Sequence, residues 1–185
     1  MKMMIHDFDD FDQLLQRIVI KRESQVFDTN LKYGLFLRYI LLNGSLDKTL
    51  YVSVGEADWV FGFLSRLYQE ATIEDNKPKI NKLIVLHLSE TRAARFEVDN
   101  LLPTDFHNRM SFNIKGLQDL SAENHFDFED IPIDNIPDFH GQMYGDWVLL
   151  GKWEIKNGLH HVRTPLTAYY RNNENFELFR KMFIE

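Results

Sequence analysis

The sequence contains no cysteine. Disulfide bonds, thiol catalysis and metal sites built from thiolates are therefore excluded, as is typical of a protein from the reducing cytoplasm. No apolar stretch approaches the roughly 18 residues that a membrane-spanning helix needs. The first residues, MKMMIHDFDDFDQLL, are acidic and lack the apolar run of a signal peptide. We therefore expect a cytoplasmic protein without a membrane partner.

Basic residues are outnumbered by acidic ones. There are 21 Lys and Arg against 28 Asp and Glu, which gives a net charge of −7. The nearest approach to a basic cluster is the short stretch VIKRES at residues 19–24. Because an acidic field repels phosphate backbones, this distribution disfavours nucleic acid as a partner.

Several motifs of common enzymes are also absent. The sequence has no glycine-rich dinucleotide or phosphate-binding loop, no Gly-x-Ser-x-Gly and no His-Glu-x-x-His. Asp138, His140 and either His160 or His161 fall near one end of the predicted sheet, but their spacing is not that of a zinc site. The acidic stretch at residues 6–12 lacks the glycine and the distal glutamate of a calcium loop. We expect no metal and no cofactor.

What is present is the composition of a folded domain. The chain has 185 residues, of which 44% are hydrophobic and 26% charged, so it is long enough for one sizeable core. We expect a single domain over residues 1–185, with an N-terminal helical extension over 1–29 and an α/β core over 30–185.

The hydrophobic pattern alternates between strands and helices. Continuous apolar strands at 49–54 and 82–88 are each followed by a helical pattern, which is typical of parallel strands covered on both faces. Asn157-Gly158 is a strong hairpin signal. Helices are predicted at 9–21, 30–42, from 58, at 89–101 and from 173, further strands at 110–114, 147–155 and 159–163, and an exposed acidic loop at 118–137.

These elements predict an α/β fold with a mixed sheet. A parallel core flanked by helices would be followed by a C-terminal antiparallel hairpin and a terminal helix.

One stretch has the outline of a catalytic motif. Residues 138–152 read DFHGQMYGDWVLLGK, with His140, Gln142 and Asp146 ahead of an apolar strand that ends in Gly151. This stretch resembles the His-x-Lys-x₄-Asp motif of the phospholipase D superfamily in a degenerate form. Gln142 takes the place of the lysine, Asp146 comes one residue early, and Lys152-Trp153-Glu154 replaces the Ser-x-Asn that follows the glycine.

The resemblance extends over residues 30–185, through the strand KLIVLHL and the terminal amphipathic helix, both of which are similar to those of regulator-like members. It implies a histidine nucleophile at His140 tuned by Asp146. Gln142 supplies no charge against the phosphate oxygens, and such a loss lowers rates by roughly 10²–10³. If the segment stays extended, the shortened spacing turns Asp146 to the other strand face, which a bulge at Gly145 would reverse.

Three functions follow from this pattern. The first is a non-catalytic phospholipase D-like binding or regulatory module, forming a homodimer and holding a phosphate-bearing ligand or a protein through Gln142, Lys152 and Arg163. The second is an active phosphodiesterase or nuclease that uses His140 with Lys152 or Arg163 as substitute cations. The third is a protein-protein adaptor of unrelated α/β fold, in which His140 is a strand-edge residue and Asp146 caps a turn.

Two other groups of residues are candidates for binding. Arg92, Arg95 and Arg109 follow the strand at 82–88 and would bind a phosphate or carboxylate if they are not simply solvated. The aromatic residues of the C-terminal region would form a partner surface if one face of the hairpin is exposed; these are Trp147, Trp153, Tyr169 and Tyr170.

Overall fold

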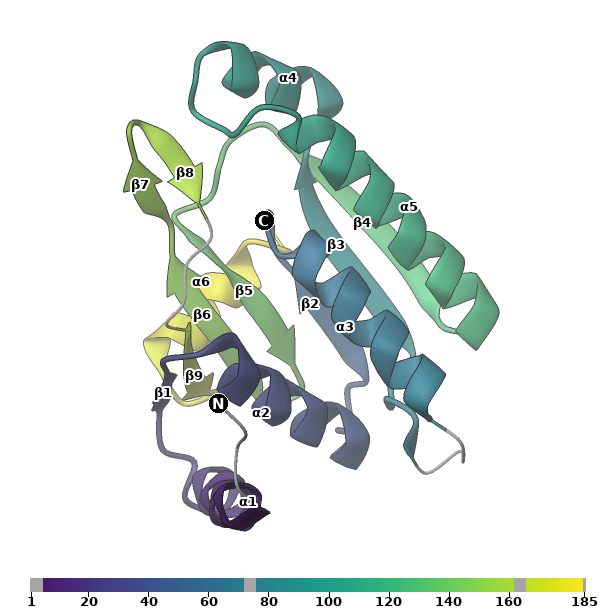
Figure 1. The fold of residues 1–185 in the computed structure, drawn as a ribbon, viewed down its shortest axis with the longest axis vertical. Helices are drawn as coiled ribbons and strands as arrows, with labels where there is room; N and C mark the ends of the chain where they lie inside the picture. The colour runs from purple at the N-terminus through teal and green to yellow at the C-terminus, as the bar shows by residue number, and fades with distance from the viewer. Residues whose placement is uncertain (1–4, 72–75, 162–165, 185) are drawn as a thin grey trace.

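The computed structural model describes residues 5–71, 76–161 and 166–184, which form an α/β fold around one large mixed sheet (Figure 1). The sheet has the strand order β1-β9-β6-β5-β2-β3-β4. Its strands are β1 (Gln25–Phe27), β2 (Thr49–Val52), β3 (Lys82–Leu88), β4 (Asp127–Ile133), β5 (Phe139–Tyr144), β6 (Trp147–Lys152) and β9 (Leu166–Tyr170). The helices are α1 (Ile5–Lys21), α2 (Asn30–Asn43), α3 (Ala57–Glu70), α4 (Glu90–Val98), α5 (Phe106–Asn124) and α6 (Glu174–Lys181).

The predicted fold class is confirmed. Strands β2, β3 and β4 are parallel and form the predicted core, and β5, β6, β9 and β1 extend it with antiparallel pairing. A separate two-stranded hairpin, β7 (Glu154–Lys156) and β8 (Leu159–His161), turns at the predicted Asn157-Gly158. In the described ranges no helix is long and apolar enough to cross a membrane.

Helices cover the two faces of the sheet unequally (Figure 1). Helices α2, α3 and α5 lie on one face, where the largest core cluster joins strands to helices through residues that include Leu50, Leu83, Phe36, Leu64 and Leu117. On the opposite face Phe176 and Phe179 of α6 pack against Met143, Val148 and Leu150. The part of this face formed by β5 and β6 is therefore covered by one helix of eight residues.

Both ends of α2 are capped. The side chain of Thr29 accepts a hydrogen bond from the backbone N–H of Lys32, at 3.3 Å. Gly44 follows the helix with φ +75°, a left-handed value that favours glycine. The predicted range of 30–42 therefore agrees with the observed helix to within one residue.

The region between β3 and β5 differs from the prediction. Residues 110–114, predicted as a strand, lie inside α5, and residues 118–137, predicted as an exposed loop, hold the end of α5 and all of β4. The buried positions of α5 show the helical spacing; they are Met110, Leu117, Leu120 and Ser121. Strand β4 lies at the sheet edge, where Pro132 is tolerated because no strand lies beyond it in the described sheet.

The bounds of several other predicted elements also need correction. Residues 25–27, assigned to an N-terminal extension, form the edge strand β1 and pair with β9. Helix α1 begins at Ile5 rather than at residue 9. The strand predicted over 147–155 divides into β6, which belongs to the sheet, and β7, which belongs to the small hairpin. The main sheet instead gains its hairpin from β5 and β6, which turn at Gly145-Asp146.

Gly141, in the middle of β5, packs against the backbone of β6. A Cβ added there would lie 1.9 Å from the carbonyl oxygen of Leu149. No side-chain rearrangement relieves a contact with backbone, so only glycine fits between these strands.

We predict that Gly141→Ala lowers the free energy of unfolding by about 3 kcal/mol or more, since β5 and β6 must separate to admit the methyl group. Gly62→Ala is the matched control, because Gly62 lies inside α3 with no heavy atom within 4 Å of the added Cβ. The control should gain about 0.5–1 kcal/mol from helix propensity. Urea unfolding followed by circular dichroism measures both, and equal effects would contradict the close packing of β5 on β6.

Candidate functional site

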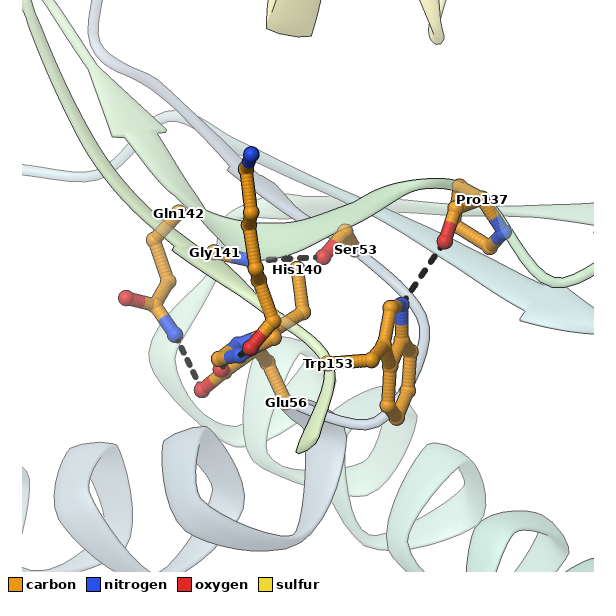
Figure 2. A network of polar contacts seen from close by, with 8 residues as sticks. Ser53, Glu56, Pro137, His140, Gly141, Gln142 and Trp153 are labelled. Atoms are coloured by element: carbon orange, nitrogen blue, oxygen red, sulfur yellow. Dashed lines mark hydrogen bonds and ion pairs between the residues drawn. The ribbon is translucent and has the colours of Figure 1, made fainter. Parts of the chain in front are cut away.

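His140 and Gln142 lie on β5 and point to the same face of the sheet, as residues two apart on a strand must. That face is covered by α3, and both side chains are fully buried, at 0% exposure. Figure 2 shows both directed toward Glu56. His140 is therefore not the strand-edge residue of the adaptor alternative, because β5 pairs on both sides, with β2 and β6.

Glu56 is the carboxylate at the centre of this network. It lies just before α3, and its own side chain is 1% exposed. Its Oε1 contacts Nδ1 of His140, and its Oε2 accepts a hydrogen bond of 2.5 Å from Nε2 of Gln142. The N-terminal end of α3 also favours a negative charge at this place.

The partners of the His140 ring determine where its protons lie. Nε2 is 3.1 Å from the backbone carbonyl oxygen of Lys152, which can only accept, so Nε2 carries a hydrogen. Nδ1 and Glu56 then share one further proton, either as imidazolium and carboxylate or as imidazole and carboxylic acid. In both forms the pair is neutral as a whole, which is how a buried histidine and glutamate avoid an unpaired charge.

The surroundings of His140 close it from solvent. Gly151 faces it across the β5–β6 pair, and a Cβ there would lie 2.9 Å from ring atoms of His140. Trp153 packs edge-on against the ring at 5.4 Å between centroids, and its Nε1–H donates to the carbonyl oxygen of Pro137 at 2.7 Å. Gly151, compared above with the superfamily's glycine, thus makes room for the ring beneath Trp153.

Ser53 extends the network, and Tyr33 lies near enough to Glu56 to be affected by its charge. Ser53 Oγ accepts a hydrogen bond from the backbone N–H of Gly141 at 2.7 Å, which continues the β2–β5 contact beyond the strand end (Figure 2). Burial raises the pKa of Tyr33, and the nearby Glu56 carboxylate raises it further. Oε1 of Gln142 is buried and has no hydrogen-bond partner in the described ranges. Both oxygens of the Glu56 carboxylate therefore have partners, His140 and Gln142, whereas Oε1 of Gln142 accepts no hydrogen bond in the described ranges.

The structure does not bring Asp146 to His140. Asp146 lies in the β5–β6 turn, where it accepts hydrogen bonds of 3.2 Å from Tyr170 and from Arg171. His140 lies toward the other end of the same hairpin. At about 3.3 Å per residue, the strand separates the two by more than roughly 13 Å. Asp146 is a turn residue ahead of Trp147, as in the adaptor alternative.

The remaining predicted ligand residues are separated from one another. Gln142 is sealed beneath α3, as described. The side chain of Lys152 is exposed, and its Nζ lies 5.9 Å from the ring centroid of Phe139. Arg163 lies outside the described residues. Of the three predicted ligand contacts, Lys152 is the one that the structure shows reaching solvent.

The other candidates have structural partners. Arg92, Arg95 and Arg109 are exposed and pair with Asp134, Asp99 and Asp58 respectively. Among the described residues, no group of three or more His, Asp or Glu side chains is arranged to hold a metal ion. Trp147 and Tyr170 are buried in the core, whereas Trp153 and Tyr169 are half-buried.

Sequence reasoning missed the role of Glu56. Its position after a buried strand was visible in the sequence, but its partner was not, because His140 lies 84 residues away and comes close only through the antiparallel pairing of β2 with β5. A glutamate placed where it must be buried was the available signal.

Comparison with known proteins gives little similarity. No family model matches the sequence, and no curated protein matches it. Among solved structures, it is similar to TrmBL2, an archaeal chromatin protein described as showing a novel mode of DNA binding, with a TM-score of 0.40 and 11% sequence identity. The match covers 96% of this chain and 59% of the other, so this chain spans about three fifths of that protein's length. At this level of similarity no function is transferred.

One expectation is nevertheless corrected. The net charge led us to disfavour nucleic acid as a partner; the match to a protein described as binding DNA runs against that expectation, and its TM-score of 0.40 assigns no partner to this chain. Net charge averages over the whole surface, whereas a ligand meets the local field of one site. The expected homodimer stays a prediction.

We predict that Glu56→Leu lowers the free energy of unfolding by about 3–5 kcal/mol, because an apolar side chain leaves Nδ1 of His140 and Nε2 of Gln142 buried without their shared partner. The matched control is Glu70→Leu, which removes a solvent-exposed pair with Arg66 and should have a much smaller effect. Urea unfolding measures both variants. Similar losses in the two would show that the Glu56 contact is not the buried pair described above.

Proposed function

We propose that this chain is a phospholipase D-like domain that binds a ligand without cleaving it. The observation that carries the proposal is the state of His140. A histidine nucleophile needs an accessible ring nitrogen with a free lone pair. Here one nitrogen faces the carbonyl oxygen of Lys152, the other faces Glu56, and the ring has no exposed surface.

The charges around His140 support the same conclusion. Phosphodiester cleavage develops negative charge on the phosphate oxygens, which positive groups must stabilise. The residue two positions from His140 is the neutral Gln142, and it is bound to the carboxylate of Glu56. A phosphate placed here would meet a negative or neutral environment, so the residues that resemble the motif serve the fold.

The sheet arrangement leaves other surfaces for binding. The buried network does not occupy the loops or the second face of the sheet. The backbone carbonyl oxygen of Lys152 contacts His140, whereas the side chain of Lys152 reaches solvent. A binding or regulatory role is therefore compatible with a sealed His140. Active cleavage through His140 is the alternative that the following experiment tests.

We predict that the purified protein does not hydrolyse bis-p-nitrophenyl phosphate above the buffer blank, with or without added divalent cations. Gln142→Lys, which restores the residue type of the motif, should also remain inactive, because the new ammonium group would pair with Glu56. Release of p-nitrophenol at 405 nm measures both.

His140→Asn provides the decisive comparison if activity is seen. Circular dichroism must first show that this variant is folded. Hydrolysis by the wild type that disappears in folded His140→Asn would overturn the proposal in favour of a phosphodiesterase. Hydrolysis that persists unchanged would indicate a contaminating enzyme.

A further inference from the structure

The second face of the sheet has a cleft beside the N-terminal end of α6. Its volume is about 480 Å³, which is within the usual range for small-molecule sites. The floor includes Leu150 of β6, and the walls come from β5, β9 and the segment after β6. The cleft opens on the opposite face of the sheet from His140, and Gly151 and Trp153, which contact the His140 ring, form part of its lining.

Two aromatic side chains flank this floor. Phe139 comes from β5 and Tyr169 from β9, the strands on either side of β6. Both are half-buried, and within the described part of the chain neither is stacked on another aromatic ring. Trp153 also lines the cleft. Flat apolar surface therefore remains available to a planar ligand.

The cleft also carries one positive charge. Lys152 lines it, with Nζ 5.9 Å from the centroid of Phe139, and no ion pair of Lys152 with a carboxylate is found among the described residues. Glu154, the acidic residue of the lining, pairs with Lys156 at 3.1 Å. Thr167 and Asn175 add neutral polar groups. An anion near Lys152 would therefore meet a net attraction.

These features together select the chemistry of the ligand. An inorganic anion would use Lys152 but leave the aromatic walls in water. An apolar ring would cover the walls but leave the ammonium group without a partner. A nucleotide satisfies both, because its base stacks on aromatic side chains and its phosphate binds a lysine.

We infer that this cleft binds a nucleotide, either free or at the end of a single strand of nucleic acid. The base lies against Phe139 or Tyr169 and the phosphate lies at Lys152. This inference rests on the proposed function, since it names a ligand for a domain that binds without cleavage. With one lysine in contact with phosphate, the affinity should fall only weakly with salt, with a slope near −0.7 on logarithmic axes for a single strand.

Isothermal titration of the full chain with AMP, adenosine and inorganic phosphate tests the inference. AMP should bind at least about ten times more tightly than adenosine or phosphate alone. Lys152→Met keeps the aliphatic stem over Phe139 and removes the charge, and it should weaken AMP binding about tenfold. Lys21→Met, an exposed lysine of α1 outside this cleft, should leave binding unchanged.

Variants of the aromatic wall separate stacking from folding. Tyr169→Phe keeps the ring and should bind AMP as the wild type does, whereas Tyr169→Leu should weaken binding several-fold. Amide shifts in NMR spectra should move at Lys152, Thr167 and Tyr169 when AMP is added. Absence of AMP binding at millimolar concentration, or binding that neither Lys152→Met nor Tyr169→Leu weakens, would overturn the inference.

A second titration with an eight-residue oligothymidylate distinguishes the two sources of the ligand. Tighter binding of the oligonucleotide than of TMP, with the same dependence on Lys152, would indicate a single strand; equal binding per site would indicate a free nucleotide.

Chromatography of the ligand after incubation separates this inference from the proposed function. A ligand that binds and is cleaved would refute the proposed function and keep the site, and a ligand that neither binds nor is cleaved would refute the site alone.

Discussion

The contact between Glu56 and His140 is the constraint on which the centre of this structure depends. It joins two segments 84 residues apart, the connection before α3 and the strand β5. Neither group could be buried alone, because an isolated charge in the interior costs several kcal/mol. The hydrogen bonds from Gln142 and to the carbonyl oxygen of Lys152 complete the pair. The positions of α3, β5 and the end of β6 are thus fixed by one neutral unit.

The same unit decides how the resemblance to a catalytic motif should be interpreted. A histidine in a strand with a polar residue two positions later is a geometry that can support catalysis, since both side chains point the same way. Here they point beneath α3 at a carboxylate instead of into a cleft. Lys152 links the two faces of the sheet: its carbonyl oxygen belongs to the buried pair, while its side chain lines the cleft on the other face.

The sequence predicted the fold class and many elements because their signals are local. The caps of α2, the continuous apolar strand β3 and the Asn157-Gly158 turn depend on neighbouring residues, and the structure agrees with each. Helix α5 was mistaken because a five-residue window centred on Phe112 looks like a strand, whereas its buried positions repeat over a longer period. Strand β4 was mistaken because an edge strand can be acidic and can contain proline.

The candidate site was harder to predict, for a different reason. Strand periodicity predicts that the side chains of His140 and Gln142 lie on the same face of the sheet. Their common partner did not, because which strand lies beside β5 depends on the packing of the whole chain. Asp146 illustrates the same limit: its closeness in sequence to His140 suggested one site, and an extended hairpin places it far away.

The acidic edge strand β4 has a consequence for the behaviour of many copies in solution. An open strand edge invites the backbone of another molecule, which is how ordered aggregates grow. At one end of this sheet Asp127 and Asp130 are exposed and Pro132 lacks a hydrogen-bond donor, while at the other end β1 has three residues. Charge repulsion and the missing N–H of Pro132 hinder the addition of a further strand to β4. The shortness of β1 hinders it at the other edge. We therefore expect the protein to resist fibril formation at high concentration better than its aromatic content suggests.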